Sequence, residues 1–338
     1  MIQGPRPLLR LAIGGTILLI FAGTLLGILV TGPVVVPQAR LTIDFEPSEA
    51  RLRTDVRRLC EGFQPRDSVD VLHAASNWIA SEFLKAGLEV EFQQFEIEGQ
   101  IYRNVMGVRR GTLESAPAIL LGAHYDAEKD SLGANDDASG MAVLLETVRT
   151  LQPGSPRYDQ YFVAFAGEAE PHAGTERSGS AYLAEALYLR GVEIDLMLSV
   201  DRVGMFDAES PQQFPLPLMR WLYPSNRTFL IVAANPANGL AIRRIKQGML
   251  ATRALPVYST RIPDQLVGLP DSAHVAFWNR GLPAALITDG TVFEKPARYN
   301  AADLNYEMMA HVVTALHGAL WNNGGAPASA IQTLGESD

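Results

Sequence analysis

The chain has 338 residues, 47% of them hydrophobic, and a formal net charge of −9 at pH 7. This length and composition allow one large buried core, because a single α/β domain often exceeds 200 residues. The negative charge excludes the basic surface that is typical of nucleic-acid-binding proteins. The single cysteine, Cys60, excludes an intramolecular disulfide and a metal site built from several thiolates.

An apolar segment lies near the N-terminus, and residues 11–31 are predicted to form a transmembrane anchor. No charged residue occurs from 11 to 39, and about 20 helical residues span the roughly 30 Å core of a bilayer. Arg6 and Arg10 precede the segment, so the positive-inside rule places residues 1–10 in the cytoplasm. The main domain is then expected outside the cytoplasm, periplasmic or extracellular, on a single-pass protein of the cell membrane. A cleaved signal peptide is the alternative, although its hydrophobic core would be unusually long.

The rest of the chain is predicted to hold a linker over 32–45, one domain over 46–322 and a disordered tail over 323–338. Within the domain, apolar strands alternate with helices, which is typical of a largely parallel sheet covered on both faces. The predicted buried strands are 118–123, 161–166, 196–200, 229–233 and 284–287, and partly alternating strands are expected at 88–97 and 104–108. The predicted helices are 46–60, 73–86, 140–151, 180–190, 238–252, 274–280 and 306–321.

Polar residues follow three of the predicted buried strands. His124 and Asp126 come after the first strand, Glu168 after the second and Asp201 after the third, while Asp136 lies in the glycine-rich loop before a helix. The carboxyl ends of parallel strands meet at one edge of the sheet, where α/β proteins bind their ligands. Nitrogen and oxygen donors of this kind suit Zn²⁺.

Each of these residues also has a structural interpretation. His124 alone would more often be a hydrogen-bonded histidine at a strand end, and Asp136 alone would more often cap the following helix. Glu168 and Asp201 alone would be surface carboxylates on loops. Their joint position after neighbouring strands favours a metal site with hydrolytic chemistry, in which Asp126 orients His124 and Glu168 is the general base.

The pattern of short motifs resembles that of the M28 family of zinc aminopeptidases. The motifs that carry the resemblance are His124-Tyr125-Asp126, Asn135-Asp136-Asp137-Ala138-Ser139-Gly140, Phe165-Ala166-Gly167-Glu168 and Asp201-Arg202-Val203-Gly204. Shorter matches support them at Arg103-Asn104-Val105, Gly179-Ser180, His274-Val275-Ala276 and Asn305-Tyr306-Glu307. The resemblance implies a phosphorylase/hydrolase-like zinc-exopeptidase fold, with a mostly parallel central sheet flanked by helices.

The resemblance also implies roles for individual residues. His124 and Asp201 would hold one zinc, Asp136 would bridge to a second, Asp126 would orient His124, and Glu168 would be the base.

Two ligands of that second zinc are replaced in this chain, by Ala169 and Asn300, and the aspartate usual before His274 is Ala273. Glu170 or His172 could replace a ligand, although surface roles are expected for both. One zinc on His124, Asp136 and Asp201 is therefore expected, with a coordination position open for water.

The sequence thus predicts a membrane-anchored metallopeptidase of the aminopeptidase type that acts on peptide substrates, binds zinc and does not bind nucleic acid. The alternative, motivated by Ala169 and Asn300, is a catalytically inactive relative that binds peptides or a partner protein.

Overall fold

The computed structural model describes residues 7–32, 35, 40–41, 43–113, 116–217, 219–261, 269, 271–293 and 298–321. The predicted tail, half of the predicted linker and the first six residues lie outside the described residues. The predicted boundaries of the domain stay predictions.

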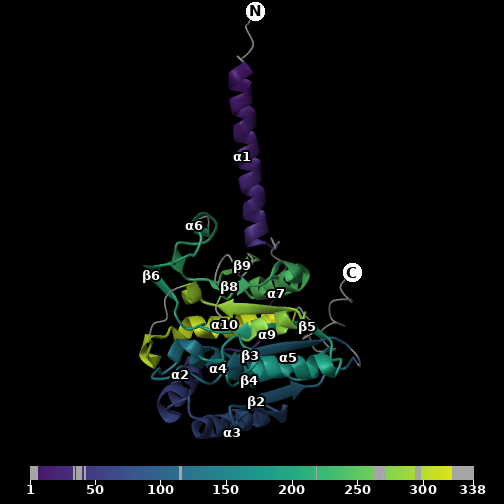
Figure 1. Cartoon of the computed structure of the whole chain (residues 1–338), viewed down its shortest axis with the longest axis vertical. Coiled ribbons are helices and arrows are strands. Elements are labelled where there is room, and N and C mark those ends of the chain that lie inside the picture. Colours follow the sequence, from purple (N-terminus) through teal and green to yellow (C-terminus); the bar gives the residue numbers. More distant parts are fainter. Residues whose placement is uncertain are drawn as a thin grey trace, which may run out of the picture.

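An eight-stranded mixed sheet forms the centre of the domain, in the order β1-β2-β4-β3-β5-β10-β8-β9 (Figure 1). The strands are β1 (Glu89–Ile97), β2 (Gln100–Arg109), β3 (Ala118–His124), β4 (Gln160–Phe165), β5 (Ile194–Val200), β8 (Leu230–Ala233), β9 (Val257–Thr260) and β10 (Ala284–Thr288). Strands β4, β3, β5 and β10 are neighbours that run parallel, and β8 and β9 are also parallel. The pairs β1–β2, β2–β4 and β10–β8 are antiparallel. The predicted α/β class with a mostly parallel sheet is confirmed.

The continuous apolar run of β3 follows from burial on both faces of the sheet. Ile119 and Leu121 belong to the core on one face, whereas Ala118 and Leu120 belong to the core on the other. Successive side chains of a strand point to opposite faces, so a strand covered on both sides has no polar face to present. All seven residues of β3 are buried, and the strand ends at His124.

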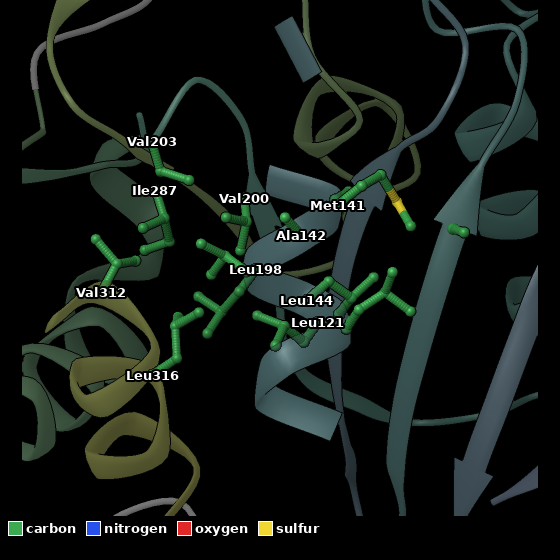
Figure 2. Packing of buried hydrophobic residues seen from close by; sticks show 14 of the residues in the cluster. Leu121, Met141, Ala142, Leu144, Leu198, Val200, Val203, Ile287, Val312 and Leu316 are labelled. Carbon is green, nitrogen blue, oxygen red and sulfur yellow. The ribbon is translucent and has the colours of Figure 1, made fainter. Parts of the chain in front are cut away.

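Helices form a layer on each side of the sheet. One side carries α2 (Glu49–Arg57), α3 (Val69–Lys85), α4 (Ser139–Arg149), α7 (Gly239–Thr252) and α10 (Tyr306–Leu320), and the other carries α5 (Gly179–Leu189) and α9 (His274–Asn279). In the larger core, Leu144, Val312 and Leu316 from the helices pack with Leu121 and Leu198 from the sheet (Figure 2). Two small strands, β6 (Asp207–Pro211) and β7 (Asn226–Arg227), and helix α6 (Met219–Leu222) lie outside the central sheet.

The sequence prediction differs from the structure mainly at element ends and at short strands. Strand β9 was not predicted, and β2 is twice as long as the strand expected at 104–108 because it pairs on both sides, with β1 and with β4. Helix α2 begins at Glu49 because Ser48 caps it, its hydroxyl accepting a hydrogen bond from Arg51 N at 3.3 Å.

Helix α1 (Pro7–Thr31) covers the apolar segment near the N-terminus and extends away from the domain (Figure 1). Over the part of the chain that the structure describes, no helix is long and apolar enough to cross a membrane. The transmembrane anchor predicted over 11–31 is therefore not confirmed.

Candidate metal centre

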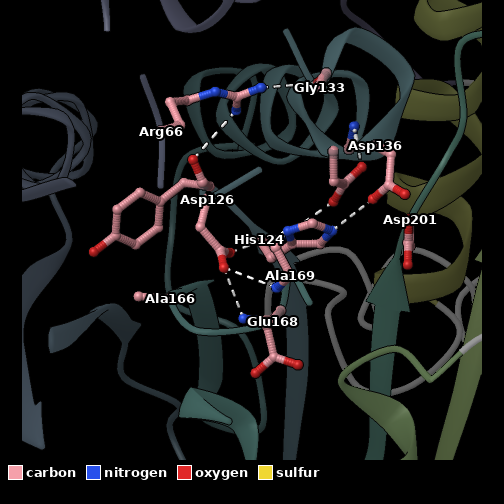
Figure 3. Close-up of polar contacts among 12 residues, drawn as sticks. Arg66, His124, Asp126, Gly133, Asp136, Ala166, Glu168, Ala169 and Asp201 are labelled. Carbon is pink, nitrogen blue, oxygen red and sulfur yellow. Dashed lines mark hydrogen bonds and ion pairs between the residues drawn. The ribbon is translucent and has the colours of Figure 1, made fainter. Parts of the chain in front are cut away.

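The imidazole of His124 lies between two carboxylates at the end of β3 (Figure 3). Its Nδ1 is 3.2 Å from Asp126 Oδ1, and its Nε2 is 3.0 Å from Asp136 Oδ1. Burial alone would lower the pKa of His124, but the hydrogen bonds to Asp126 and Asp136 outweigh it and raise this pKa well above its ordinary value. A metal on Nε2 needs the neutral ring, so metal binding here would release a proton.

Asp126 connects His124 to the loop that follows β4. Its second oxygen, Oδ2, accepts hydrogen bonds from the backbone N–H groups of Glu168 at 2.9 Å and of Ala169 at 2.8 Å (Figure 3). The carboxylate is buried and held on both oxygens, so its orientation toward the histidine ring is fixed. This is the arrangement by which an outer carboxylate orients a histidine ligand of a metal.

Asp136 and Asp137 are neighbours in the turn Ala134–Ala138 and are joined by a cis peptide bond. Their carboxylates have different hydrogen-bond partners. Burial would raise the pKa of Asp136, but the contacts with His124 and Arg202 lower it below its ordinary value, so Asp136 is ionised at neutral pH. Asp137 is wholly buried, and its two oxygens accept backbone hydrogen bonds from Gly140 at 2.9 Å, His124 at 3.2 Å and Arg202 at 3.2 Å. The helix-capping role considered for Asp136 therefore belongs to Asp137.

Asp201 lies directly after β5 and is buried, with its Oδ1 having no hydrogen-bond partner among the described residues. Burial raises the pKa of Asp201, and the charge of Asp136 adds to this shift. Ligand atoms of His124, Asp137 and Asp201 all lie within 4.8 Å of one another. A buried carboxylate oxygen without a partner, beside an imidazole and further carboxylates, fits a divalent cation of the zinc type.

Asp136 is a better candidate than Asp137 for the remaining ligand. Asp136 Oδ1 already faces His124 Nε2, the ring nitrogen that would bind the metal, and Asp136 lines the pocket at this edge of the sheet. Asp137 is not among the residues that line this pocket, and its oxygens are taken by three backbone N–H groups.

Glu168 is buried beside this cluster and is held by the start of α5. Its Oε1 accepts a hydrogen bond from Ser180 N at 2.6 Å, and its Oε2 accepts one from the Ser180 hydroxyl at 3.0 Å. Its carboxylate points away from the His124 ring (Figure 3). Burial raises the pKa of Glu168 to about 8.

A pocket of about 210 Å³ collects these side chains at the carboxyl edge of β3, β4 and β5. His124, Asp136, Glu168 and Asp201, all predicted from the sequence, line it. The remaining lining residues are Glu128, Ala169, Glu170, Ala173, Arg202, Asp271 and Ser272. The pocket is therefore strongly acidic, with one arginine in its wall.

The positions that depart from the family pattern lie in different surroundings. Ala169 lines the pocket and offers no ligand atom there. Asn300 is exposed and caps the short helix Ala301–Asp303, with its N–H donating to Asp303 Oδ2 at 2.7 Å. Of the two residues considered as replacements, Glu170 lines the pocket, whereas His172 packs its ring edge against Tyr102.

His274 is fully buried, and both of its ring nitrogens lack a hydrogen-bond partner among the described residues. Burial lowers the pKa of His274 to about 3, so the ring is neutral. The residue before it, Ala273, cannot supply the carboxylate that the family pattern places there.

Three residues to which the sequence analysis gave no role support the site. Arg202 contacts Asp136, and Ser180 holds Glu168. The third is Arg66, whose buried guanidinium donates to the carbonyl oxygens of Tyr125 at 3.2 Å, Leu132 at 2.6 Å and Gly133 at 2.9 Å (Figure 3). Arg202 and Ser180 belong to motifs that carry the family resemblance, but no sequence pattern near Arg66 marks it as a support of the segment between β3 and α4.

An α/β domain with a histidine and carboxylates gathered in a pocket at the carboxyl edge of its parallel strands is the architecture of a metallohydrolase. The model of peptidase family M28 matches residues 104–308 of this chain. The chain therefore belongs to peptidase family M28, as the sequence motifs predict, and the predicted class of metallopeptidase is confirmed with it.

Individual relatives agree with this membership. The chain is 34% identical over 292 residues to the protein YfbL of Escherichia coli (strain K12), covering 82% of this chain and 88% of that protein. It is 30% identical over 169 residues to a probable zinc metalloprotease of Pyrenophora tritici-repentis, covering 44% of this chain and 34% of that protein. The structure of BSAP, a zinc aminopeptidase from Bacillus subtilis, superposes with a TM-score of 0.67 at 14% identity, covering 84% of this chain and 96% of that one, and so shares the fold.

Proposed function

We propose that the protein is an aminopeptidase that binds one zinc ion through His124, Asp136 and Asp201. The observation that carries this proposal is the convergence of these side chains with Glu168 in one pocket, although they come from the ends of three strands and from a separate loop. The names of relatives, a zinc aminopeptidase and a probable zinc metalloprotease, support the choice of metal and of substrate class. Zinc, when bound, would supply a Lewis acid that polarises the peptide carbonyl and acidifies a water molecule.

The chain's own residues supply the remaining chemistry. Asp126 keeps the His124 ring in the orientation that presents Nε2 to the pocket. Glu168, as a carboxylate, takes a proton from the attacking water and passes it to the leaving amine. The side chains of Glu128, Glu170 and Asp271 line the same pocket and would attract the positively charged N-terminus of a peptide.

An inactive relative is not favoured, because the base and the complete ligand set for one metal are retained in one pocket. A binding protein would have no chemical need for a buried Glu168 carboxyl held by two hydrogen bonds.

A substrate panel with a variant at the base tests the proposal. The full chain, supplied with zinc, should hydrolyse some members of a series of aminoacyl p-nitroanilides. Replacing Glu168→Gln should lower kcat by about 10²- to 10⁴-fold while zinc content stays the same, because only the proton transfer is lost. Glu193→Gln, at an exposed position before β5, is the matched control and should leave turnover unchanged. No turnover by the unaltered chain on any substrate would favour the binding protein, and full activity of Glu168→Gln would reject this base.

The location outside the cytoplasm remains a prediction that rests on the sequence of residues 1–31. Fractionation of cells that express the full chain would test it, and recovery of the protein in the cytoplasmic fraction would contradict it.

A further inference from the structure

The carboxylate of Asp136 is engaged on both of its oxygens. Oδ1 faces His124 Nε2 at 3.0 Å, on the side where a metal would bind. Oδ2 accepts hydrogen bonds from Arg202, from Nη2 at 2.5 Å and from Nε at 3.0 Å. Two nitrogens of Arg202 thus donate to the same oxygen, Asp136 Oδ2, which is not the oxygen that faces His124.

The backbone of Arg202 is held firmly in an unusual conformation. Its φ of 55° lies in the left-handed region, which residues other than glycine rarely adopt. Its N–H donates to Asp137 Oδ1 at 3.2 Å, and its carbonyl oxygen accepts from Asp289 N at 2.8 Å and from the Thr288 hydroxyl at 3.1 Å. Three contacts from two other segments therefore fix this residue where its side chain reaches Asp136.

The charge of Arg202 is permanent in this setting. An arginine guanidinium stays protonated in proteins, and Arg202 Nη2 lies 2.5 Å from Asp136 Oδ2. Arg202 Nε is 3.9 Å from Asp201 Oδ1, the buried oxygen without a hydrogen-bond partner among the described residues. The guanidinium therefore contributes a fixed positive charge next to two of the three proposed metal ligands, with only 18% of its side chain exposed.

We propose that Arg202 is a positioning residue that takes the place of a second metal ion and limits the centre to one. This inference rests on the proposed zinc site. A second cation on Asp136 would need Oδ2, which Arg202 holds, and it would lie against a positive charge that cannot be neutralised. Ala169, which also lines the pocket, offers no side-chain ligand atom for a second ion. Arg202 thereby orients Asp136 toward His124 and balances its charge without a second ion.

Metal binding by four forms of the full chain tests this inference. Metal-stripped protein would be titrated with zinc chloride, freed of excess zinc by gel filtration and measured by elemental mass spectrometry. The four forms are the unaltered chain, Arg202→Met, Ala169→Glu, and the double variant. The first three should hold one zinc each, and the double variant should hold two, because only there are a free Asp136 oxygen and a new carboxylate both available.

The affinity for the second ion should depend on the charge at position 202. In the Ala169→Glu background, Arg202→Met should strengthen second-ion binding by about 10- to 100-fold, the range known for groups that contact metal ligands. Arg202→Lys in that background keeps the positive charge and should stay at one zinc. Arg110→Met in that background, which removes an arginine that pairs with Glu89 and Asp159, is the matched control and should also stay at one.

The outcomes separate this inference from the proposed function. Two zinc ions in the unaltered chain, or two in Ala169→Glu with Arg202 present, would overturn the role of Arg202 but leave the metal site intact. A double variant that folds, as judged by circular dichroism, and still holds one ion after Asn300→His is added to it would also overturn it. No zinc in the unaltered chain would overturn the proposed metal site itself. Titration with Co²⁺, followed by the visible absorption of the bound ion, gives a second measurement of the number of metal ions per chain.

Discussion

The two carboxylates that flank His124 have different surroundings, and this difference gives them different tasks. Asp126 is buried and accepts two backbone hydrogen bonds on the oxygen that does not face the ring. The side chain of Asp136 is 37% exposed, lines the pocket, and is held by Arg202 instead of by the backbone. A carboxylate fixed by the backbone is suited to orient a ligand, whereas one at the pocket wall is suited to be a ligand.

Glu168 makes the stability of the metal-free protein depend on pH. Its pKa is about 8 in the folded protein against an ordinary value of 4.5. The folded state therefore favours the protonated form, and the resulting stabilisation is complete below pH 4.5 and is lost as pH rises to about 8. Glu168→Gln mimics the protonated carboxyl, so its stability relative to the unaltered protein should rise by up to about 5 kcal/mol between pH 4.5 and pH 8.

Urea unfolding of both metal-free proteins at pH 5 and pH 8 measures this difference. Glu193→Gln, at an exposed position, should show no such change and serves as the control. A constant difference in unfolding free energy between Glu168→Gln and the unaltered protein would mean that Glu168 titrates like an exposed carboxylate.

The sequence predicts the residues of the site and, through the family motifs, a role for each, but it does not predict how neighbouring residues hold them. His124, Asp126, Asp136, Glu168 and Asp201 follow strands whose order along the chain already places them at one sheet edge. The family motifs assign Asp136 as the ligand, but the role of Asp137, which accepts three backbone hydrogen bonds, depends on the backbone of one turn. The side-chain direction of Arg202 depends on a left-handed conformation that is typical of glycine, so its sequence gives no sign of it.

At the scale of elements, the junction between the turn Ala134–Ala138 and α4 depends on the absence of a side chain at Gly140. A Cβ there would lie against the Asp137 carboxylate and 2.5 Å from the Val200 carbonyl oxygen. Asp137 holds the backbone of His124, Gly140 and Arg202 together, so a displacement of its carboxylate would disturb β3, α4 and the loop after β5 at once.

Gly140→Ala should therefore lower both the stability and the zinc affinity of the protein. A loss of about 1–3 kcal/mol in the free energy of unfolding is expected, as for other insertions of a methyl group into a packed interior. Gly62→Ala is the control, because a Cβ there would meet Arg58 Cγ at an ordinary 3.7 Å. Urea unfolding gives the first quantity and competition with a chelator the second. Equal behaviour of the two variants would contradict the role given to Asp137.

Sequence patterns predict the apolar, fully buried strands well, and they predict strands with polar residues or with antiparallel partners poorly. Strands β3, β4 and β5 were predicted within two residues at each end, because burial on both faces leaves a continuous apolar run. Strand β9 contains Ser259 and Thr260, so it lacks the continuous apolar run by which β8, which also has four residues, was predicted. The full length of β2 follows from its two antiparallel neighbours, and a single sequence does not show which strands will pair.

For the whole molecule, the fold gathers acidic side chains from distant parts of the sequence in one pocket. The acidic pocket at the carboxyl edge of the sheet agrees in sign with the net charge of −9. A field of this sign favours both a divalent cation and the ammonium group of a peptide N-terminus, and it disfavours acidic substrates. Arg202 supplies one positive charge to this pocket, and the proposed metal ion would supply another.

Hydrolysis measured against zinc content tests the central claim most directly. Metal-stripped full chain would be given increasing equivalents of zinc, with turnover of the best aminoacyl p-nitroanilide recorded at each step. We predict no activity without zinc, a linear rise and a plateau at one equivalent per chain. Activity in the metal-stripped chain, a plateau at two equivalents, or no turnover at any zinc concentration would contradict a one-zinc aminopeptidase.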